Sequence, residues 1–381
     1  MSRKLIRLSK SCLSDSEKKS VMNVLDKEFL GMGAEVEEFE HALTEFFGRP
    51  TVCVVSGTAA LHLALQACGI RKGDEVIVPS LTYVASFQSI SATGATPIAC
   101  DISTNSLLLD LSDAEKRITS RTKAIMPVHY SGDVGDINAL YAFAKKHGLR
   151  VIEDAAHAFG SVFEGKRVGS FGDIACFSFD GIKNITAGEG GCIVTDDERI
   201  LSAIKDARLL GVEKDTDMRF SGQRSWDYDV SDQGWRYHMS NIMAAIGLEQ
   251  LKRFPLLSAK RREVALLYDG LLKSSPCLTL LDRNYYFVVP HIYVVLIEGI
   301  YDRDKLRANL LSYGIQTGIH YLPNHKLSLY NKSCEFPLPK TELVYSKLLT
   351  LPLHPDLYKS DVEYVCEKLR LLLEGDKVKD E

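Results

Sequence analysis

One lysine stands out by its surroundings in the stretch "CFSFDGIKNITAGEGG", which runs from Cys176 to Gly191. Lys183 follows an apolar run at 174–179 that is typical of a buried strand, and a second apolar run begins at Cys192. A single lysine in a turn is most often a solvated surface residue. In a partly desolvated turn, however, its amine can form a Schiff base with an aldehyde. The Ser, Thr and Gly residues around it keep such a turn tight and let a ligand approach the backbone.

Other polar or aromatic residues follow the ends of predicted strands. In open parallel sheets, ligands bind at the carboxyl ends of the strands. Each residue taken alone has an ordinary structural explanation, such as capping of a helix. Their convergence on one edge favours a binding site, because unrelated structural residues would scatter over both edges. The residues are Ser56, Gly57, Thr58, Tyr83, His129, Asp154, His157, Ser178 and Lys183.

Two of the chemical requirements of a ligand are met by this set. A phosphate group binds backbone N–H groups at a helix N-terminus together with hydroxyls, and Gly57, Thr58 and Ser178 supply these. A pyridine nitrogen stays protonated beside a buried carboxylate, and Asp154 is placed for that contact.

Two further requirements concern a flat ring and an aldehyde. Tyr83 offers an aromatic face on which a ring can stack. Lys183 offers the amine for the aldehyde. Phosphate, pyridine ring and aldehyde together describe pyridoxal 5′-phosphate (PLP), which we therefore predict as the cofactor.

The elements that position these residues alternate between short apolar runs and helical patterns. Most of the runs are apolar on both faces, as strands covered by helices on each side must be. This alternation predicts an α/β fold with a mostly parallel sheet of about seven strands, flanked by helices. The predicted strands are 51–55, 74–79, 96–100, 122–128, 150–153, 174–179 and 191–195.

The last third of the chain has a different pattern. Ser240 is predicted to cap a helix that reaches residue 254, and a long charged helical pattern follows Pro255. A strand-like run at 290–297 and a helical pattern at 302–314 come next. We therefore expect a large α/β domain at residues 1–252 and a smaller α+β domain at 253–381.

Composition excludes several classes of protein. Apolar residues make up 45% of the chain and charged residues 25%, which is enough for a globular core. The net charge is −4 without a basic cluster, which argues against nucleic acid as a partner. No apolar stretch is long enough for a transmembrane helix, and the start lacks the apolar segment of a secretory signal. The nine scattered cysteines without CxxC spacing predict reduced thiols, a cytoplasmic protein and no metal site.

Several stretches in combination resemble a known family. They are "VSGTAALHLAL", "GDEVIVPSLTYVAS", "IMPVHYSG", "VIEDAAHAFGS", "FSFDGIKNITAGEGG" and "GIHYLPNH". The chain is similar to the DegT/DnrJ/StrS sugar aminotransferases, which belong to fold-type I of the PLP enzymes. The matching stretches spread over roughly residues 30–350, although "SGT" or "EDAAH" alone would be weak signals.

The resemblance implies roles for individual residues. Lys183 would be the Schiff-base lysine, Asp154 would contact the pyridine nitrogen and His157 would lie near the ring oxygen. Thr58 and Ser178 would bind the phosphate, and Tyr83 would stack on the ring. The family also implies a homodimer with active sites shared across the interface.

The chain departs from the family pattern at two places. Many members carry G-x-N-x-R-M before the helix that begins near Ser240, whereas this chain has "GWRYHM". Arg236 therefore stands at the usual Asn and His238 at the usual Arg, in a loop that reaches the partner's cofactor phosphate in the family. Asp180 stands where several relatives have His.

The reaction that the resemblance implies is a two-stage transamination. An amino acid, expected to be L-glutamate, gives its amino group to the cofactor, and a nucleotide-diphosphate keto sugar then takes it. Lys183 would act as the general base that moves the proton. Four residues of "HYLPNHK" are candidates to hold the sugar or its diphosphate, although a proline-rich turn with surface histidines is the structural alternative. They are His320, Tyr321, His325 and Lys326.

The position of amination on the sugar is the finer question. The stretches "KNITAGEGG" and "PVHYSG" resemble members that aminate C4 of a 4-keto, 6-deoxy sugar for glycan or O-antigen synthesis, and amination at C3 is the alternative. A sugar dehydratase of the same fold is a second alternative, but such enzymes carry His in place of the lysine found at 183. A non-catalytic regulator is a third, although a sensor needs no base. The nucleotide is left open.

Overall fold

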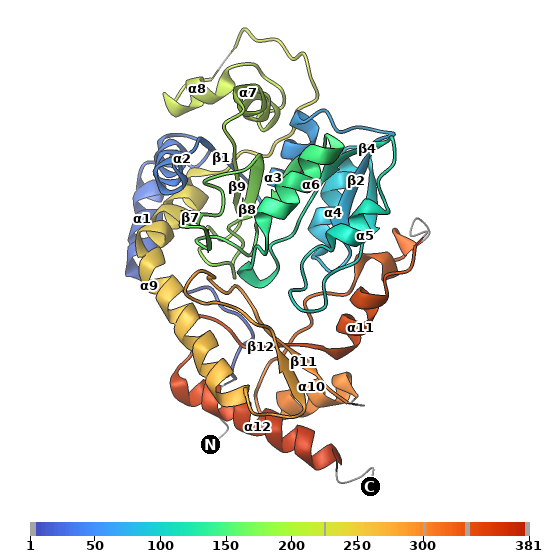
Figure 1. The fold of residues 1–381 in the computed structure, drawn as a ribbon. Helices are drawn as coiled ribbons and strands as arrows, with labels where there is room; N and C mark the ends of the chain where they lie inside the picture. The colour runs from blue at the N-terminus through green and yellow to red at the C-terminus, as the bar shows by residue number, and fades with distance from the viewer. Residues whose placement is uncertain (1–4, 225, 300–301, 332–335, 378–381) are drawn as a thin grey trace.

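A seven-stranded sheet forms the centre of the molecule (Figure 1). The computed structural model describes residues 5–224, 226–299, 302–331 and 336–377. Within the sheet only β9 runs against its neighbours, since it pairs antiparallel with both β1 and β8. The predicted mostly parallel sheet of seven strands is thus confirmed. Its strands, in spatial order, are β1 (Thr51–Val54), β9 (Gly191–Val194), β8 (Ile174–Ser178), β5 (Arg150–Asp154), β4 (Thr122–Ile125), β2 (Glu75–Pro79) and β3 (Thr96–Cys100).

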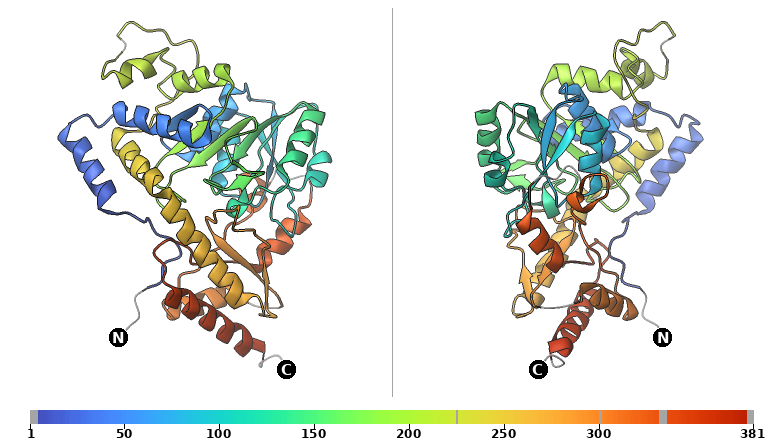
Figure 2. Two further views of the ribbon diagram at one scale, coloured as in Figure 1. Left: turned by 60° about the vertical axis from the view of Figure 1, so that its left-hand side comes forward. Right: turned by 90° about the vertical axis from the view of Figure 1, so that its right-hand side faces the viewer.

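Both faces of this sheet are buried, as the two-sided apolar runs predict. Along β1, Val52 and Val54 belong to one apolar cluster while Cys53 between them belongs to the cluster on the opposite face. Helices cover the two faces and the flank of the sheet (Figure 2). They are α2 (Ala34–Phe47), α3 (Gly57–Ala67), α4 (Val84–Ala92), α5 (Leu111–Glu115), α6 (Ile137–His147) and α7 (Glu198–Ala207).

Helix α9 (Asn241–Leu272) begins where the sequence predicts it. The Ser240 side chain accepts a hydrogen bond from the Met243 backbone N–H, so the predicted cap is present. The helix then runs through Pro255 without a break, which the sequence pattern did not predict. Proline removes one backbone hydrogen bond. Contacts of α9 with helices α1, α2 and α12 along its whole length outweigh that loss (Figure 2).

A second core surrounds a small antiparallel sheet. Its strands are β10 (Leu278–Leu280), β11 (Tyr293–Ile297) and β12 (Leu348–Leu351), and helices α10 (Arg303–Ser312) and α12 (Lys359–Lys377) lie beside it. Ile6, near the start of the chain, is buried in this core and not in the first two clusters. Residue 252 lies inside α9, so a domain division at that point stays a prediction.

Shorter elements complete the fold. They are α1 (Asp15–Asp26), β6 (Val162–Phe163), β7 (Lys166–Arg167), α8 (Asp215–Phe220), α11 (Pro339–Lys347), and the 3-10 turns η1 (Tyr130–Gly132) and η2 (Asn324–Lys326). Cys53, Cys100, Cys176 and Cys192 are buried free thiols of the large sheet, whereas Cys334 lies outside the described residues. None of the helices in the described part of the chain combines the length and the apolar character needed to cross a membrane.

Candidate active site

A cavity of about 410 Å³ opens at the carboxyl edge of the large sheet. Residues that follow β1, β2, β5 and β8 line it, and residues of the second half of the chain close one side. Nine of the predicted site residues are among those that line it: Gly57, Thr58, Tyr83, Asp154, His157, Ser178, Lys183, His320 and Tyr321.

Lys183 lies in the turn after β8, where its backbone N–H donates to the Asp180 carbonyl. Its side chain is half-buried, and its Nζ lies 3.3 Å from Nε2 of His291. Burial lowers the pKa of Lys183 to about 8, although the carboxylates of Asp154 and Asp180 act in the opposite direction. The amine is therefore unprotonated far more often near neutral pH than a solvated lysine would be.

Asp154 is the last residue of β5 and is buried. Its Oδ2 accepts a hydrogen bond from Ser86 Oγ at 2.7 Å, and its Oδ1 accepts one from the Ala156 backbone N–H at 3.2 Å. Both donors are neutral groups that fix the direction of the carboxylate without cancelling its charge. The carboxylate can therefore act on a cationic ring nitrogen in the cavity.

The N-terminus of α3 lies against the end of β8. A Cβ atom at Gly57 would lie 2.8 Å from Cβ of Ser178, so only glycine allows this close approach. Ser56 caps the helix by accepting from the Ala59 N–H, which matches the structural explanation of that residue. The exposed Thr58 hydroxyl and the Ser178 hydroxyl flank the first turn. A helix N-terminus with two hydroxyls and no side chain at Gly57 fits a phosphate group.

Aromatic rings form the remaining wall. The ring centroids of Tyr83 and Tyr321 lie 5.6 Å apart, and the Tyr321 hydroxyl is 2.9 Å from Nε2 of His157. The His157 ring also contacts His291, with 4.4 Å between centroids. Burial, followed by the charge of Lys183, holds the pKa values of both histidines well below the usual range. These rings are therefore neutral at pH 7 and offer single hydrogen bonds instead of charge.

The structure places four of the predicted residues away from this cavity. His325 Nδ1 pairs with Ser80 Oγ at 2.8 Å, and both His325 and Lys326 contact Glu342. Arg236 and His238 lie in a segment beside β1, where His238 forms an isolated antiparallel bridge with Val54. The roles predicted for these four residues stay predictions.

Three polar side chains that contact Asp154 or Lys183 are not among the sequence predictions: Ser86, Arg261 and His291. Ser86 orients Asp154, while His291 and Arg261 lie beside Lys183. The sequence gives little indication of a site role for two of them, since His291 stands in an apolar strand-like run and Arg261 in a charged helical pattern.

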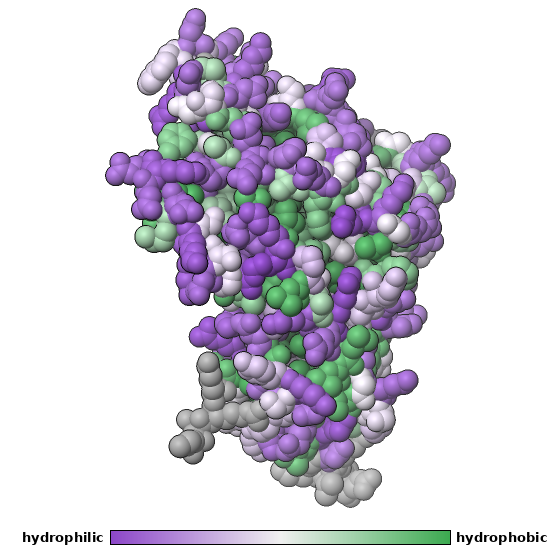
Figure 3. All heavy atoms as spheres, turned by 90° about the vertical axis from the view of Figure 1, so that its left-hand side faces the viewer, coloured by the Kyte–Doolittle hydropathy of each residue, from purple (hydrophilic) through white to green (hydrophobic). Residues whose placement is uncertain are grey.

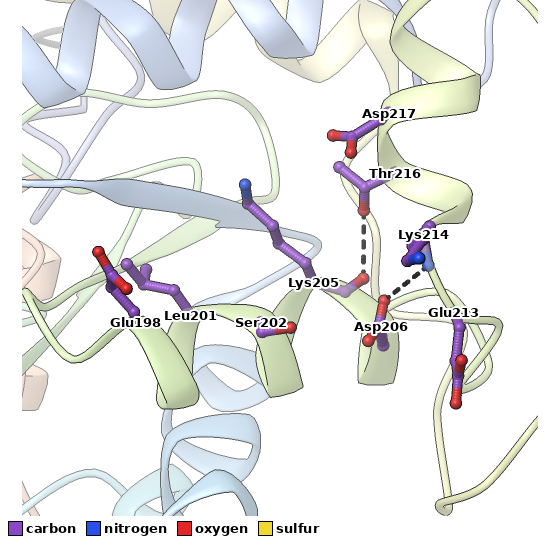
Figure 4. Close-up of a pocket in the computed structure, with 9 residues that line it drawn as sticks. All are labelled: Glu198, Leu201, Ser202, Lys205, Asp206, Glu213, Lys214, Thr216 and Asp217. Carbon is purple, nitrogen blue, oxygen red and sulfur yellow. Dashed lines mark hydrogen bonds between the residues drawn. The ribbon is translucent and has the colours of Figure 1, made fainter.

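A second hollow lies between α7 and α8, away from the sheet edge. Figure 4 shows that its charged side chains do not converge on one point. The bonds drawn there join Thr216 to the Lys205 carbonyl and the Lys214 N–H to Asp206, so they hold the segment together. No cluster of three or more metal-binding side chains is present among the described residues. We assign no chemistry to this hollow.

Comparisons with known proteins identify the family of the chain. The model of the DegT/DnrJ/EryC1/StrS aminotransferase family matches residues 11–370. The spore coat polysaccharide biosynthesis protein SpsC of Bacillus subtilis is 37% identical over 372 residues, which cover 95% of this chain and 96% of SpsC.

Solved structures give the same result. Spr1654 from Streptococcus pneumoniae, solved in a PMP-form and a PLP-form, is 30% identical to this chain. The PMP-form has a TM-score of 0.92 and covers 99% of this chain and all of its own. Helicobacter pylori PseC, an aminotransferase involved in the biosynthesis of pseudoaminic acid, has a TM-score of 0.90 at 31% identity, with coverage of 98% and 100%. S. venezuelae DesV, solved with a ketimine intermediate, has a TM-score of 0.85 at 33% identity, with coverage of 94% and 95%.

Proposed function

Because this chain belongs to the DegT/DnrJ/EryC1/StrS aminotransferase family and is a PLP-dependent sugar aminotransferase, we propose that it moves an amino group from L-glutamate to C4 of a nucleotide-linked keto sugar. The observation that carries this proposal is the convergence of Lys183, Asp154 and the α3 N-terminus on one cavity. The stretches that resemble C4-aminating members support the position on the sugar. Relatives named for spore coat polysaccharide and pseudoaminic acid synthesis support a role in making a glycan precursor, such as an O-antigen sugar.

The residues around the cavity suit the parts of the cofactor. The α3 N-terminus, with Gly57, Thr58 and Ser178, would hold the phosphate. Asp154 would keep the ring nitrogen protonated, and Tyr83 would lie against the ring. His157, anchored by Tyr321, would face the ring oxygen. When bound, PLP supplies an aldehyde and a ring that withdraws electrons from the amino carbon.

Lys183 would be the proton carrier of both half-reactions. With a pKa near 8, its amine can take a proton and return it at neutral pH. The donor and the sugar would occupy the same cavity in turn, so one lysine can serve both. Lys183 and Asp154 both line this cavity, which supports this role.

Two pairs of residues are proposed to contact the substrate, one inside the cavity and one outside it. His320 and Tyr321 line the cavity and would face the sugar. His325 and Lys326 lie outside the cavity of this chain, and we propose that they reach the diphosphate. Lys326 would first have to leave its ion pair with Glu342, whose Oε1 lies 3.1 Å from Nζ.

We also propose a homodimer with shared active sites. Apolar side chains are exposed on α1 and in the segments that flank it, where Leu13, Met22, Leu25, Phe29 and Leu30 are each more than two-fifths exposed. Figure 3 shows the face that carries α1, α2 and α9, with apolar patches between hydrophilic side chains. Exposed apolar patches of this kind mark protein interfaces. The buried free thiols fit the cytoplasm as the place of action.

A panel of nucleotide keto sugars incubated with L-glutamate or with other amino acids tests the proposal. We expect a 4-amino sugar nucleotide with L-glutamate as donor, identified by mass spectrometry and NMR. Lys183→Ala serves as the control and should abolish turnover while leaving the fold intact, since a turn lysine contributes little to the core. An amino group at C3, or preference for another donor, would contradict the proposal.

A further inference from the structure

Arg261 of α9 joins two segments that meet behind Lys183. Its Nη2 donates to the carbonyl oxygens of Ile182 at 3.3 Å and Lys183 at 3.0 Å. Its Nη1 donates to the carbonyl oxygen of His291 at 3.2 Å. The guanidinium therefore clamps the turn that carries the lysine to the segment that enters β11.

The charge of Arg261 is not compensated nearby. The side chain is only 2% exposed, and no carboxylate lies within ion-pair distance of it among the residues that the structure describes. Burying a cation without a partner is costly, and a neutral amide could also donate to carbonyl groups. A buried, unpaired charge whose hydrogen bonds a neutral amide could also make suggests that the charge of Arg261 has a role of its own. Lys183 is a neighbouring cationic group, and the like charge of Arg261 adds to burial, the main cause, in lowering its pKa.

His291 makes its side-chain contact with the same lysine. Its Nε2 lies 3.3 Å from Lys183 Nζ, while its buried Nδ1 has no hydrogen-bond partner within the described part of the chain. A cavity of about 10 Å³ on another side of the ring, lined also by Ser9 and Thr350, has room for one water molecule. A buried histidine that serves the fold usually bonds to backbone groups, and the side chain of this one contacts Lys183 instead.

We propose that Arg261 and His291 are positioning residues for Lys183: the first fixes the turn and places a like charge behind the amine, and the second accepts an N–H of Nζ and sets its direction. The inference rests on the proposed role of Lys183 as the lysine that joins the cofactor. It adds that two residues from the second half of the chain prepare this amine before any ligand binds.

Several other groups face the amine and must be considered in any titration. Asp154 and Asp180 favour its charged form, and Arg261 opposes it. The neighbouring rings are uncharged at neutral pH, because burial lowers the pKa of the histidines and raises that of the tyrosine. These rings are His157, His291, His320 and Tyr321.

The test is the titration of Lys183 in protein freed of cofactor. The rate at which cyanate modifies Lys183 is measured against pH and read by peptide mass spectrometry. In the parent protein we expect a midpoint near 8. A midpoint above 10, as for a solvated lysine, would overturn the inference without any variant.

Two variants should have different effects on this midpoint. Arg261→Gln keeps amide donors but loses the like charge, so the midpoint should rise by about one pH unit and modification at pH 7 should slow roughly tenfold. His291→Phe keeps a ring but loses the acceptor of the charged amine, so the midpoint should fall or stay. If the two residues were merely structural, both variants would admit water to the turn and both midpoints would rise.

Arg261→Lys is the matched control, because it keeps the charge and loses the forked geometry. Its midpoint should stay within about half a pH unit of the parent value, and a rise equal to that of Arg261→Gln would contradict the role of the charge. Circular dichroism confirms folding of each variant. If Arg261→Gln does not fold, the His291→Phe titration still tests the inference, because a rise in its midpoint would contradict it. Because the readout needs neither cofactor nor substrate, its failure is distinguishable from a failure of the proposed aminotransfer.

Discussion

Asp154 shows how a single carboxylate sets the chemistry of the cavity. Asp154→Asn keeps the volume and the Ser86 contact but removes the charge opposite the ring nitrogen. We expect a loss of about 3 kcal/mol of transition-state stabilisation, roughly a hundredfold in the rate of the half-reaction with L-glutamate. Single-turnover absorbance measures that rate and the cofactor spectrum together.

Ser86→Ala provides the comparison for this prediction. It removes one neutral hydrogen-bond donor to Asp154 and leaves the charge of the carboxylate. We therefore expect a loss of about 1 kcal/mol of transition-state stabilisation. Equal losses in the two variants would mean that orientation matters and charge does not. An unchanged rate and spectrum in Asp154→Asn would remove Asp154 from the cofactor site.

Most of the residues found from the sequence end a strand or come within a few residues after one, whereas His320 and Tyr321 belong to the stretch "GIHYLPNH". Asp154 and Ser178 end β5 and β8, so an apolar run and its last residue are enough to place them. His291 and Arg261 reach the same lysine from the second half of the chain. Their approach depends on how α9 and the small sheet pack against the large one, and no local pattern encodes that packing.

At the scale of elements, Gly57 controls how closely α3 approaches β8. Gly57→Ala would place a Cβ atom 2.8 Å from that of Ser178, with backbone 3.3 Å away, so the helix must shift. We expect a loss of about 1–3 kcal/mol of unfolding free energy and weaker retention of the cofactor. Thermal unfolding and cofactor absorbance after dialysis measure the two effects.

Gly270→Ala in α9 is the matched control for this substitution. Apart from the backbone of the helix itself, no heavy atom of the residues that the structure describes lies within 4 Å of the added Cβ, and alanine favours a helix over glycine by up to about 1 kcal/mol. The control should therefore be neutral or more stable, with normal cofactor retention. Identical behaviour of the two variants would show that the close approach at Gly57 is unimportant.

Glu17 joins α1 to α9 and makes this contact sensitive to acid. Its carboxylate is buried and contacts Arg253 and Gln250 of α9, and it also accepts from the Ser14 backbone. Burial raises the pKa of Glu17, but hydrogen bonds from Ser14 and the charge-assisted contact with Arg253 lower it to about 2.

A carboxylate whose pKa is lowered by folding stabilises the folded state at pH values above its unfolded pKa. This stabilisation is lost as the pH falls through the pKa of the folded state. The contribution of Glu17 should therefore be complete above about pH 5 and disappear between about pH 4.5 and 2. Glu17→Gln should unfold at lower urea concentration at pH 7 and lose less stability on acidification than the parent. Parallel pH dependence of the two proteins would contradict this prediction.

The pattern of elements was more accessible from the sequence than their details. The ends of the seven strands of the large sheet lie within three residues of the ends of the predicted runs, because each run is apolar and bounded by turn residues. The short β6–β7 hairpin and the continuity of α9 through Pro255 were not predicted. Both depend on contacts with distant segments that outweigh local preference.

For the whole molecule, the resemblance in sequence has been confirmed at the level of family, fold class, enzyme class and cofactor. The assignment of individual residues and of the homodimer stays a proposal. The segment before α9 bears on both proposals, because its residues are proposed to contact the cofactor of the partner subunit. It lies beside β1, since the Val55 N–H donates to the Tyr237 carbonyl, and it carries the exposed Arg236 and the half-buried His238.

Arg236 is exposed and has no ion pair within the described part of the chain, so the pairing with Asp232 that would make its loss silent is not formed. A guanidinium donates two parallel hydrogen bonds to a phosphate, which suits a contact with the cofactor of the partner subunit. Arg236→Ala should therefore weaken cofactor retention, and more strongly in dilute protein, where dimers dissociate. The measurement is cofactor dissociation by absorbance across a series of protein concentrations. Arg71 is another exposed arginine that forms no ion pair with the described residues, so Arg71→Ala should match the parent throughout. If Arg236→Ala also matches the parent, His238 or the backbone of this loop becomes the partner's contribution.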